Sequence, residues 1–480
     1  MSIIQQGKTG LQWTSLSAIF GIVLQLIQIA ILARFLEAEA FGLMALAVVA
    51  INFAQAFSDI GLSSAIIHHD KIHRQQLSTL YWLNILAAGT IACIVICSAP
   101  IIADFYNQPD LANILITISA CFICHALGQQ PKTLLQKELQ FKIIAVIEMV
   151  GKIIALSVAV CMAYYGFGVY ALVYAAILSS LFLAIGYMVL GYKKNKPGFY
   201  FDIKSVSALL HFGTYTAAER IVTLLSYNID SILIGKLLGI DALGLYNLAK
   251  QIIIRPAQII NPIVTKVTVP IMAKMQNDIT LLRGIYLKTT NYLASVNFPI
   301  YGFIGIFAAT IVNVVFGSEW TELTPIIQIL CIYGALRSTA NPLGSLIVAK
   351  GRYKLGFYWN MISLILVFPA VYTGSYYGLI GVCWALVMLS AGLIIPHWFF
   401  IVRTLCAAGI FEYHKQILIP CLITIIAMAT MVMCHHLTNG TDLALIFSLV
   451  CGCLVLLCLN MSINRDFIRS IITLIIIRPR

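Results

Sequence analysis

The decapeptide RFLEAEAFGL at residues 34–43 recurs as KLLGIDALGL at residues 236–245. Each begins with a basic residue, has an acidic residue at its sixth position and ends in Gly-Leu. Further matches keep the same order along the chain: Leu46-Ala47 with Leu248-Ala249, Pro131 with Pro342, Phe141-Lys142 with Tyr353-Lys354, and YYGFGVYALV from Tyr164 with YYGLIGVCWALV from Tyr376. The sequence therefore predicts a chain built from two related halves, about 200 residues apart.

The composition excludes a soluble protein. Of 480 residues, 61% are hydrophobic and 10% are charged, whereas about 25% are charged in an average soluble domain. The mean hydropathy is +0.95. So few polar residues could not cover a soluble enzyme or a nucleic-acid-binding protein of this length. We therefore expect an integral membrane protein with many helices.

A transmembrane helix needs about 20 mainly apolar residues. Fourteen stretches meet this requirement, near residues 13–33, 41–67, 78–103, 111–130, 143–163, 168–190, 207–234, 243–271, 285–315, 323–346, 355–373, 379–402, 416–435 and 443–460. Open strands would leave backbone groups without hydrogen bonds in hydrocarbon. The prediction is an all-α integral membrane fold with 14 transmembrane helices.

The repeat divides these helices into six, six and two. Because each half holds an even number of helices, both halves have the same orientation, related by an axis along the membrane normal. We predict an N-terminal six-helix lobe at residues 1–203, a C-terminal six-helix lobe at 204–403, and helices 13–14 with a cytoplasmic tail at 404–480. Two parallel six-helix bundles around a central cleft are typical of transporters, with the ligand near the midplane.

The net charge of +12 predicts orientation rather than a polyanion partner. With the N-terminus in the cytoplasm, 22 of the 30 Lys and Arg residues fall on cytoplasmic segments, and the outside loops carry only Arg34 and Lys236. Basic residues concentrate on the cytoplasmic side of membrane proteins. We therefore expect both termini in the cytoplasm. The opening residues lack a small-residue cleavage pattern, so we expect the first helix to be retained.

Ten charged residues lie inside the predicted spans, where a charge at the bilayer centre costs about 2.5–3.5 kcal/mol. The acidic ones are Asp59, Glu148, Glu219 and Asp230, and the basic ones are Lys152, Arg220, Lys250, Arg255, Lys266 and Arg337. Four of these cations lie near the centres of four different helices: Lys152, Arg220, Arg255 and Arg337. A ring of cations at one depth in the cleft suits a diphosphate or an acidic sugar.

Pairing within the protein is the alternative to ligand binding. Glu148 and Lys152 are four residues apart on one helix and could neutralise each other. Asp230 could pair with Lys250 across two helices. The cations that would then still lack an obvious partner are Arg220, Arg255, Lys266 and Arg337.

No catalytic or metal-binding pattern appears. Nearly all of the thirteen cysteines lie in apolar runs, and the CxxC of Cys121 and Cys124 lies in an apolar helix without a βαβ context. The intramembrane histidines are isolated, and we expect them to be packed or to face water: His125, His211 and His397. Metalloprotease, P-loop and nucleophile-elbow motifs are absent from the sequence. We expect neither enzymatic activity nor a cofactor.

Several short stretches carry a family resemblance that covers residues 7 to about 355. In the first half they are Leu32-Ala-Arg34, Phe41-Gly-Leu43, Ser58-Asp59-Ile-Gly61, Ala65-Ile-Ile67, Thr79-Leu-Tyr-Trp-Leu-Asn84, Gln108-Pro-Asp-Leu111, Gly128-Gln-Gln130 and Gln136-Lys-Glu-Leu139. In the second half they are Tyr246-Asn-Leu-Ala249, Asn261-Pro262, Phe316-Gly317 with Trp320, Arg337-Ser338 and Asn341-Pro-Leu-Gly-Ser345. Together they resemble the Wzx-type polysaccharide flippases of the multidrug/oligosaccharidyl-lipid/polysaccharide exporter superfamily, and within it the exporters of colanic acid.

This resemblance implies transport by alternating access across the bacterial inner membrane. The expected substrate is an undecaprenyl-diphosphate-linked oligosaccharide used to make surface or extracellular polysaccharide. Expected partners are membrane lipid, a polysaccharide polymerase and chain-length proteins, with no nucleic acid, and an H⁺ or Na⁺ gradient would drive transport. The charged residues inside the predicted spans, rather than a family motif, supply the candidate site: we expect Arg220, Arg255, Arg337, Lys152, Lys250 and Lys266 to bind the substrate, and Asp230 or Glu148 to carry the coupling ion.

Two other functions remain as alternatives. An ion-coupled small-molecule antiporter of the same fold would be expected to have acidic rather than cationic residues in its cleft. A membrane-embedded polysaccharide-modifying enzyme would be expected to have a sizeable outside loop, or a histidine supported by other polar groups. The sequence shows neither pattern.

Overall fold

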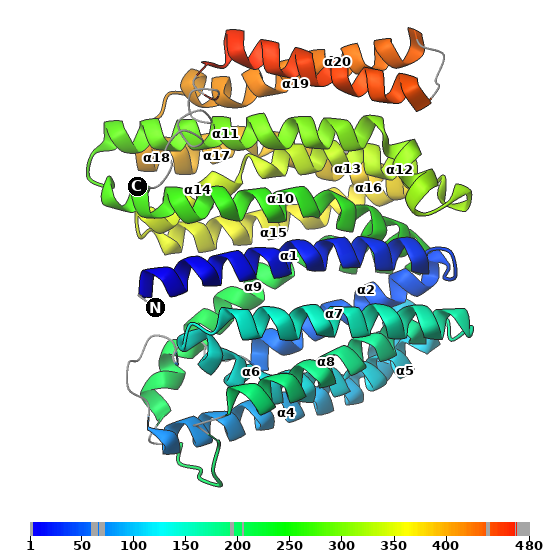
Figure 1. Cartoon of the computed structure of the whole chain (residues 1–480), viewed down its shortest axis with the longest axis vertical. Coiled ribbons are helices and arrows are strands. Elements are labelled where there is room, and N and C mark those ends of the chain that lie inside the picture. The colour runs from blue at the N-terminus through cyan, green and yellow to red at the C-terminus, as the bar shows by residue number, and fades with distance from the viewer. Residues whose placement is uncertain are drawn as a thin grey trace. The chain divides into compact units, whose positions relative to one another are not determined.

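The computed structural model describes residues 3–58, 66, 73–192, 196–203, 206–437, 442–465 and 467, and within these ranges it is helical and has no strand. It divides into two compact units, Met1–Asn247 and Leu248–Arg480. The division falls inside α10 (Ile240–Lys274), so this helix begins in the first unit and continues in the second. Within each unit the long helices run side by side (Figure 1).

The first unit holds the N-terminal helices. They are α1 (Ile3–Leu32), α2 (Ala38–Ser58), α4 (Arg74–Tyr106), α5 (Pro109–Ile118), α6 (Ala120–Lys137), α7 (Phe141–Tyr164), α8 (Tyr170–Gly191) and α9 (Ser207–Leu237). Helix α7 packs between α1 and α8, and α6 packs against α8 and α4. Asn107, in the left-handed conformation (φ 54°), ends α4, and Pro109 begins α5, where its missing N–H costs nothing.

The second unit is centred on α11. Its helices are α11 (Ile279–Ile306), α12 (Ala308–Val315), η2 (Ser318–Trp320), α13 (Leu323–Ser338), α14 (Asn341–Ala349), α15 (Tyr353–Ser375), α16 (Gly378–Gly392), α17 (Ile394–His397), the π-helical turn η3 (Trp398–Val402), α18 (Arg403–Cys406), α19 (Ile410–Leu437) and α20 (Asp442–Ile463). Helix α11 packs against α13 and α19, and α19 packs against α20. The fully buried rings of Tyr286 and Tyr413 stack at 6.4 Å and join α11 to α19.

Ten of the described helices or helix pairs are long and apolar enough to cross a membrane, and an eleventh is broken. The predicted span at 285–315 is this broken one: α11 and α12 meet at 67°, because Phe307 leaves the helical conformation (φ −90°, ψ 16°). The predicted spans at 207–234 and 243–271 lie on α9 and α10, which are not among the ten. Three prolines and several basic residues lower the hydropathy of α10.

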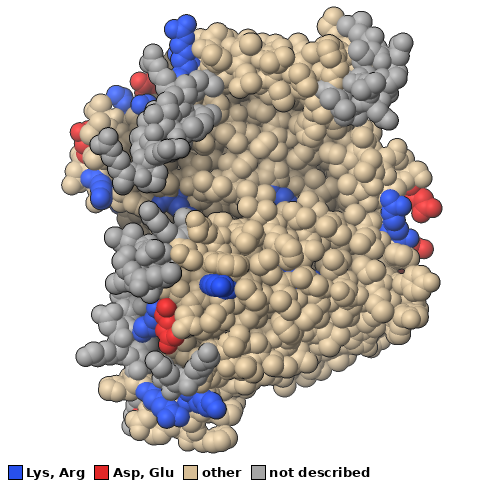
Figure 2. Space-filling view, in the orientation of Figure 1, with Lys and Arg blue, Asp and Glu red and all other residues tan. Residues whose placement is uncertain are grey.

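The apolar helices expose their hydrophobic side chains rather than burying them. In α15 only 6% of the apolar window is buried within the protein, and in α4 only 17%. On the face shown in Figure 2, charged residues gather mainly toward the ends of the helices, with only isolated cations in the uncharged band between. A surface of this kind is stable when hydrocarbon covers it. The protein is therefore a multi-pass integral membrane protein.

The two tyrosine pairs that match in the sequence each lie at a turn between two packed helices. Tyr164 and Tyr165 lie at the turn between the packed pair α7 and α8, and Tyr376 and Tyr377 at the turn between the packed pair α15 and α16. All four rings are more than 70% exposed. Exposed tyrosines at helix ends are typical of the membrane–water interface.

Candidate functional site

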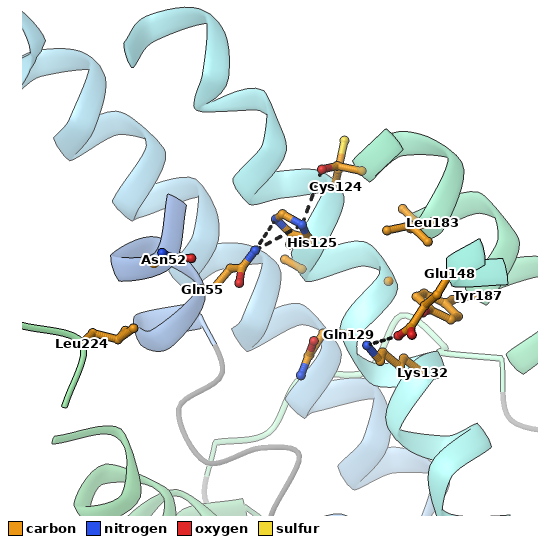
Figure 3. Close-up of a pocket in the computed structure, with 14 residues that line it drawn as sticks. Asn52, Gln55, Cys124, His125, Gln129, Lys132, Glu148, Leu183, Tyr187 and Leu224 are labelled. Atoms are coloured by element: carbon orange, nitrogen blue, oxygen red, sulfur yellow. Dashed lines mark hydrogen bonds and ion pairs between the residues drawn. The ribbon is translucent and has the colours of Figure 1, made fainter. Parts of the chain in front are cut away.

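A cavity of about 320 Å³ lies in the first unit among α2, α6, α7, α8 and α9 (Figure 3). We call it the α6 pocket. Its amide side chains are Asn52 and Gln55 of α2 and Gln129 of α6. Its other hydrogen-bonding side chains are His125, Lys132, Glu148, Ser180 and Tyr187. Eight of its 14 lining residues therefore carry hydrogen-bonding side chains, in an otherwise apolar unit.

An ion pair forms one wall of the α6 pocket. The ammonium of Lys132 donates to Glu148 Oε1 at 2.8 Å, and each side chain remains about 30% exposed. The hydroxyl of Tyr187 also donates to Glu148 Oε1, at 3.2 Å, and the Lys132 ammonium lies 5.6 Å from the centre of the Tyr187 ring. The pair neutralises its own charge and leaves part of each group open to the cavity.

The opposite wall is formed by neutral polar groups. The Gln55 amide lies 3.1 Å from His125 Nδ1, and His125 Nε2 lies 3.4 Å from the Ser180 hydroxyl. Figure 3 shows Gln55 of α2 pointing toward His125 of α6. The amide of Asn52 forms no hydrogen bond with any residue in the described part of the chain. Among the described residues, it is therefore a hydrogen-bonding group without a protein partner.

Close packing of α6 fixes the pocket. Gly128 lets α6 approach α8, because a Cβ there would lie 3.1 Å from Ala184 Cα. On the other side of α6, the fully buried Asn84 of α4 donates to the carbonyl of Ala126 at 3.1 Å. Together these contacts hold the turn of α6 that carries His125 and Gln129.

The structure places Lys152 beside α1 rather than in the α6 pocket. Its ammonium lies 3.5 Å from the Ser17 carbonyl and fills the space where a Cβ on Gly21 would lie. The Ser17 hydroxyl lies 3.5 Å from Glu148 Oε2. The pairing of Glu148 with Lys152 was left open by the sequence, and the ion pair seen at 2.8 Å joins Glu148 to Lys132 instead.

Two predicted cations lie near one helix contact in the second unit. Ile253 of α10 touches Gly334 of α13, so closely that a Cβ on Gly334 would lie 2.6 Å from Ile253 Cγ2. Arg255 is two residues beyond this contact on α10, and Arg337 is three residues beyond it on α13. Both are half-buried. Both arginines thus lie within one helical turn of this contact between α10 and α13.

Neutral partners contact these two arginines. Arg255 donates to Gln258 Oε1 at 3.0 Å, and Arg337 donates to the Tyr333 hydroxyl at 2.6 Å. The guanidinium of Arg337 also lies 5.7 Å from the centre of the Tyr333 ring. These contacts orient the two guanidinium groups.

The other predicted residues are dispersed. Lys250 is buried and Lys266 is exposed, both on α10. Asp230 is only 4% exposed, and it accepts a hydrogen bond from the Tyr246 hydroxyl at 2.6 Å and from its neighbour's backbone N–H at 2.8 Å. Arg220 belongs to helix α9, but its side chain lies outside the described residues, as does Asp59.

The sequence reasoning missed most of the α6 pocket. It assigned Lys132 to a cytoplasmic loop, whereas α6 continues to Lys137 and carries Lys132 inside the helix. It expected His125 to be packed or to face water, and the structure places it in the pocket wall. The detectable signal was the polar run from Cys124 to Lys132 within an apolar segment.

Comparison with known proteins decides the family. Residues 31–325 match the family described as "Polysaccharide biosynthesis protein". The chain belongs to this family. The teichuronic acid biosynthesis protein TuaB of Bacillus subtilis (strain 168) is 34% identical over 94% of this chain and 95% of that protein. The lipopolysaccharide biosynthesis protein WzxC of Escherichia coli (strain K12) is 32% identical over 88% of this chain and 86% of that protein.

The fold agrees with this assignment. The lipid II flippase MurJ in an inward closed conformation aligns with 95% of this chain and 100% of its own, with a TM-score of 0.77 and 15% sequence identity. The resemblance of this polysaccharide biosynthesis protein to the Wzx-type flippases is confirmed. Membership identifies the chain as an exporter and not an enzyme.

Proposed function

We propose that this protein flips an undecaprenyl-diphosphate-linked oligosaccharide from the cytoplasmic to the periplasmic leaflet of the bacterial inner membrane. Family membership over most of the chain carries this proposal. The glycan would enter surface or extracellular polysaccharide, with a polymerase and chain-length proteins acting next. The proposed topology is 14 spanning helices with both termini in the cytoplasm, arranged as two parallel six-helix repeats at 1–203 and 204–403, followed by helices 13–14 at 404–480.

The diphosphate would be held by arginine side chains of the predicted spanning helices. Arg255 and Arg337 fit this role best, because both are half-buried within one helical turn of the contact between Ile253 of α10 and Gly334 of α13. Guanidinium groups bind phosphate oxygens in pairs of hydrogen bonds. The cations proposed to assist them are Arg220, Lys152, Lys250 and Lys266.

The coupling ion would be carried by a buried carboxylate, with an H⁺ or Na⁺ gradient as the source of energy. Asp230 is the stronger candidate, since it is nearly inaccessible and receives a short hydrogen bond from Tyr246. Glu148 is the second candidate, already engaged by Lys132 and Tyr187.

A complementation experiment tests the flippase function. Arg255→Ala and Arg337→Ala are expressed in a flippase-null strain and exported polymer is measured at matched protein amounts. Each variant removes a charge-assisted contact of about 1.5–3 kcal/mol, so export should fall about tenfold or more. Arg352→Ala, at an exposed turn before α15, is the matched control. Full export by both variants would refute the assignment, and transport of a small cation instead would favour the antiporter.

A further inference from the structure

We propose that the α6 pocket binds a sugar residue of the lipid-linked glycan, apart from the cations that hold its diphosphate. This inference rests on the proposed flippase function and extends it by naming where the glycan is recognised. Three properties of the α6 pocket support it: its charge balance, its size and its hydrogen-bonding groups.

The charge balance argues against a diphosphate in this pocket. Among the residues that line it, the only cationic lysine and the only carboxylate pair with each other at 2.8 Å. A diphosphate carries several negative charges and needs cations that are not already matched. The pocket is therefore suited to a ligand, or part of a ligand, that is neutral or nearly so.

The size of the cavity argues against a bare ion. A volume of about 320 Å³ falls within the range of roughly 300–1,000 Å³ found for small-molecule sites. Such sites are usually lined mainly by hydrophobic side chains, whereas eight of the 14 residues that line the α6 pocket carry hydrogen-bonding side chains. A hydroxyl-rich organic group matches both observations, and an apolar drug matches only the first.

The hydrogen-bonding groups are those that recognise hydroxyls. A sugar hydroxyl both donates and accepts, and the amides of Asn52, Gln55 and Gln129 can do both as well. These amides come from two helices, α2 and α6, while the Lys132–Glu148 pair adds a donor and an acceptor that are each about 30% exposed. Asn52 has no hydrogen bond to give up to residues of the described chain, so a ligand would not have to break one.

The pocket also lies where the glycan would arrive. In the proposed orientation the C-terminal halves of α2 and α6 and the N-terminal half of α7 lie toward the cytoplasm. Asn52, Lys132 and Glu148 belong to these segments. A sugar bound here would be recognised before transport, on the side where the lipid-linked glycan is made.

The test compares two ligands that differ only in the glycan. The probes are undecaprenyl diphosphate itself and the lipid-linked repeat unit purified from a flippase-null strain, each titrated into the full-length protein in nanodiscs. Asn52→Ala should weaken binding of the glycan-bearing lipid roughly tenfold, the effect of one lost hydrogen bond. It should leave the affinity for undecaprenyl diphosphate unchanged. Gln55→Ala is the second variant, and Asn113→Ala on the exposed face of α5 is the control.

The outcomes separate the two proposals. Equal weakening of both ligands, or of neither, by Asn52→Ala and Gln55→Ala would overturn the sugar site while leaving the flippase function intact. Failure of the unmodified protein to bind either lipid would overturn the flippase function itself. Loss of binding confined to the glycan-bearing lipid supports the sugar site.

Discussion

Gly42 of α2 and Gly244 of α10 meet at a helix crossing that has no room for a side chain. A Cβ on Gly42 would overlap the carbonyl oxygen of Ile240, and a Cβ on Gly244 would overlap the carbonyl oxygen of Ala38. The two glycines occupy matching positions of the repeated decapeptide, and so do Ala38 and Ile240. The contact is thus reciprocal, as a two-fold relation between the repeats would require.

Replacement of either glycine should destabilise the protein. In Gly42→Ala and Gly244→Ala the new methyl group meets backbone, which cannot rotate away, so we expect a loss of about 1–3 kcal/mol in the free energy of unfolding. Thermal unfolding of the purified protein in detergent measures this. Gly89→Ala is the matched control, because a Cβ at that helical glycine meets nothing within 4 Å. Equal melting temperatures for all three variants would contradict the prediction.

The Lys132–Glu148 pair should contribute modestly to stability. Because both side chains are about one third exposed, we expect a coupling energy of about 1 kcal/mol from a double-mutant cycle of Lys132→Met and Glu148→Gln. The matched cycle uses Arg283→Met and Glu412→Gln, a more exposed pair 3.7 Å apart, whose coupling should be near zero. Equal coupling energies in the two cycles would show that the α6 pocket does not strengthen the ion pair.

Asp230→Asn should uncouple transport from the ion gradient without unfolding the protein. The amide keeps the shape of the carboxylate and an oxygen that can accept from Tyr246, but it cannot release a proton. Glycolipid translocation is measured in vesicles with and without an imposed H⁺ or Na⁺ gradient. We expect the unmodified protein to respond to one gradient and the variant to respond to neither. Tyr246→Phe is the control, and loss of the response in Glu148→Gln alone would move the coupling role to Glu148.

The proposed topology predicts which turns react from each side of the membrane. Phe199, 98% exposed, lies in the segment after α8, and Tyr377, 83% exposed, lies between α15 and α16. In a cysteine-free background, Phe199→Cys should react with a membrane-impermeant maleimide only in inside-out vesicles. Tyr377→Cys should react only in intact cells stripped of their outer barrier. Labelling of both from the same side would refute the odd number of spans between them.

Most of the fold was predictable because hydropathy is a local property. A single segment in hydrocarbon must pair its backbone N–H and C=O groups within itself. Each long apolar run was therefore expected to form a helix. The breaks were not predictable in the same way. The 67° bend between α11 and α12 depends on the conformation of Phe307, for which the sequence offers no signal of its own.

The candidate site was also predictable only in part. Depth along a helix can be counted, so the sequence proposes Arg255 and Arg337 as candidates, and the structure places each within one helical turn of the Ile253–Gly334 contact. Which side chains of different helices face each other cannot be derived from their positions in the sequence. Glu148 had Lys152 one turn away on its own helix, yet its ion pair is with Lys132 of α6.

The sequence by itself determined the membrane class and the long helices, since these follow from hydropathy, and its self-similarity predicts the repeat. The tertiary structure alone decided the α6 pocket and the reciprocal contact of Gly42 with Gly244. Both depend on how closely particular helices approach each other, and that distance is set by the side chains of several helices together. The distance between two helices cannot be derived from the spacing of residues within either helix.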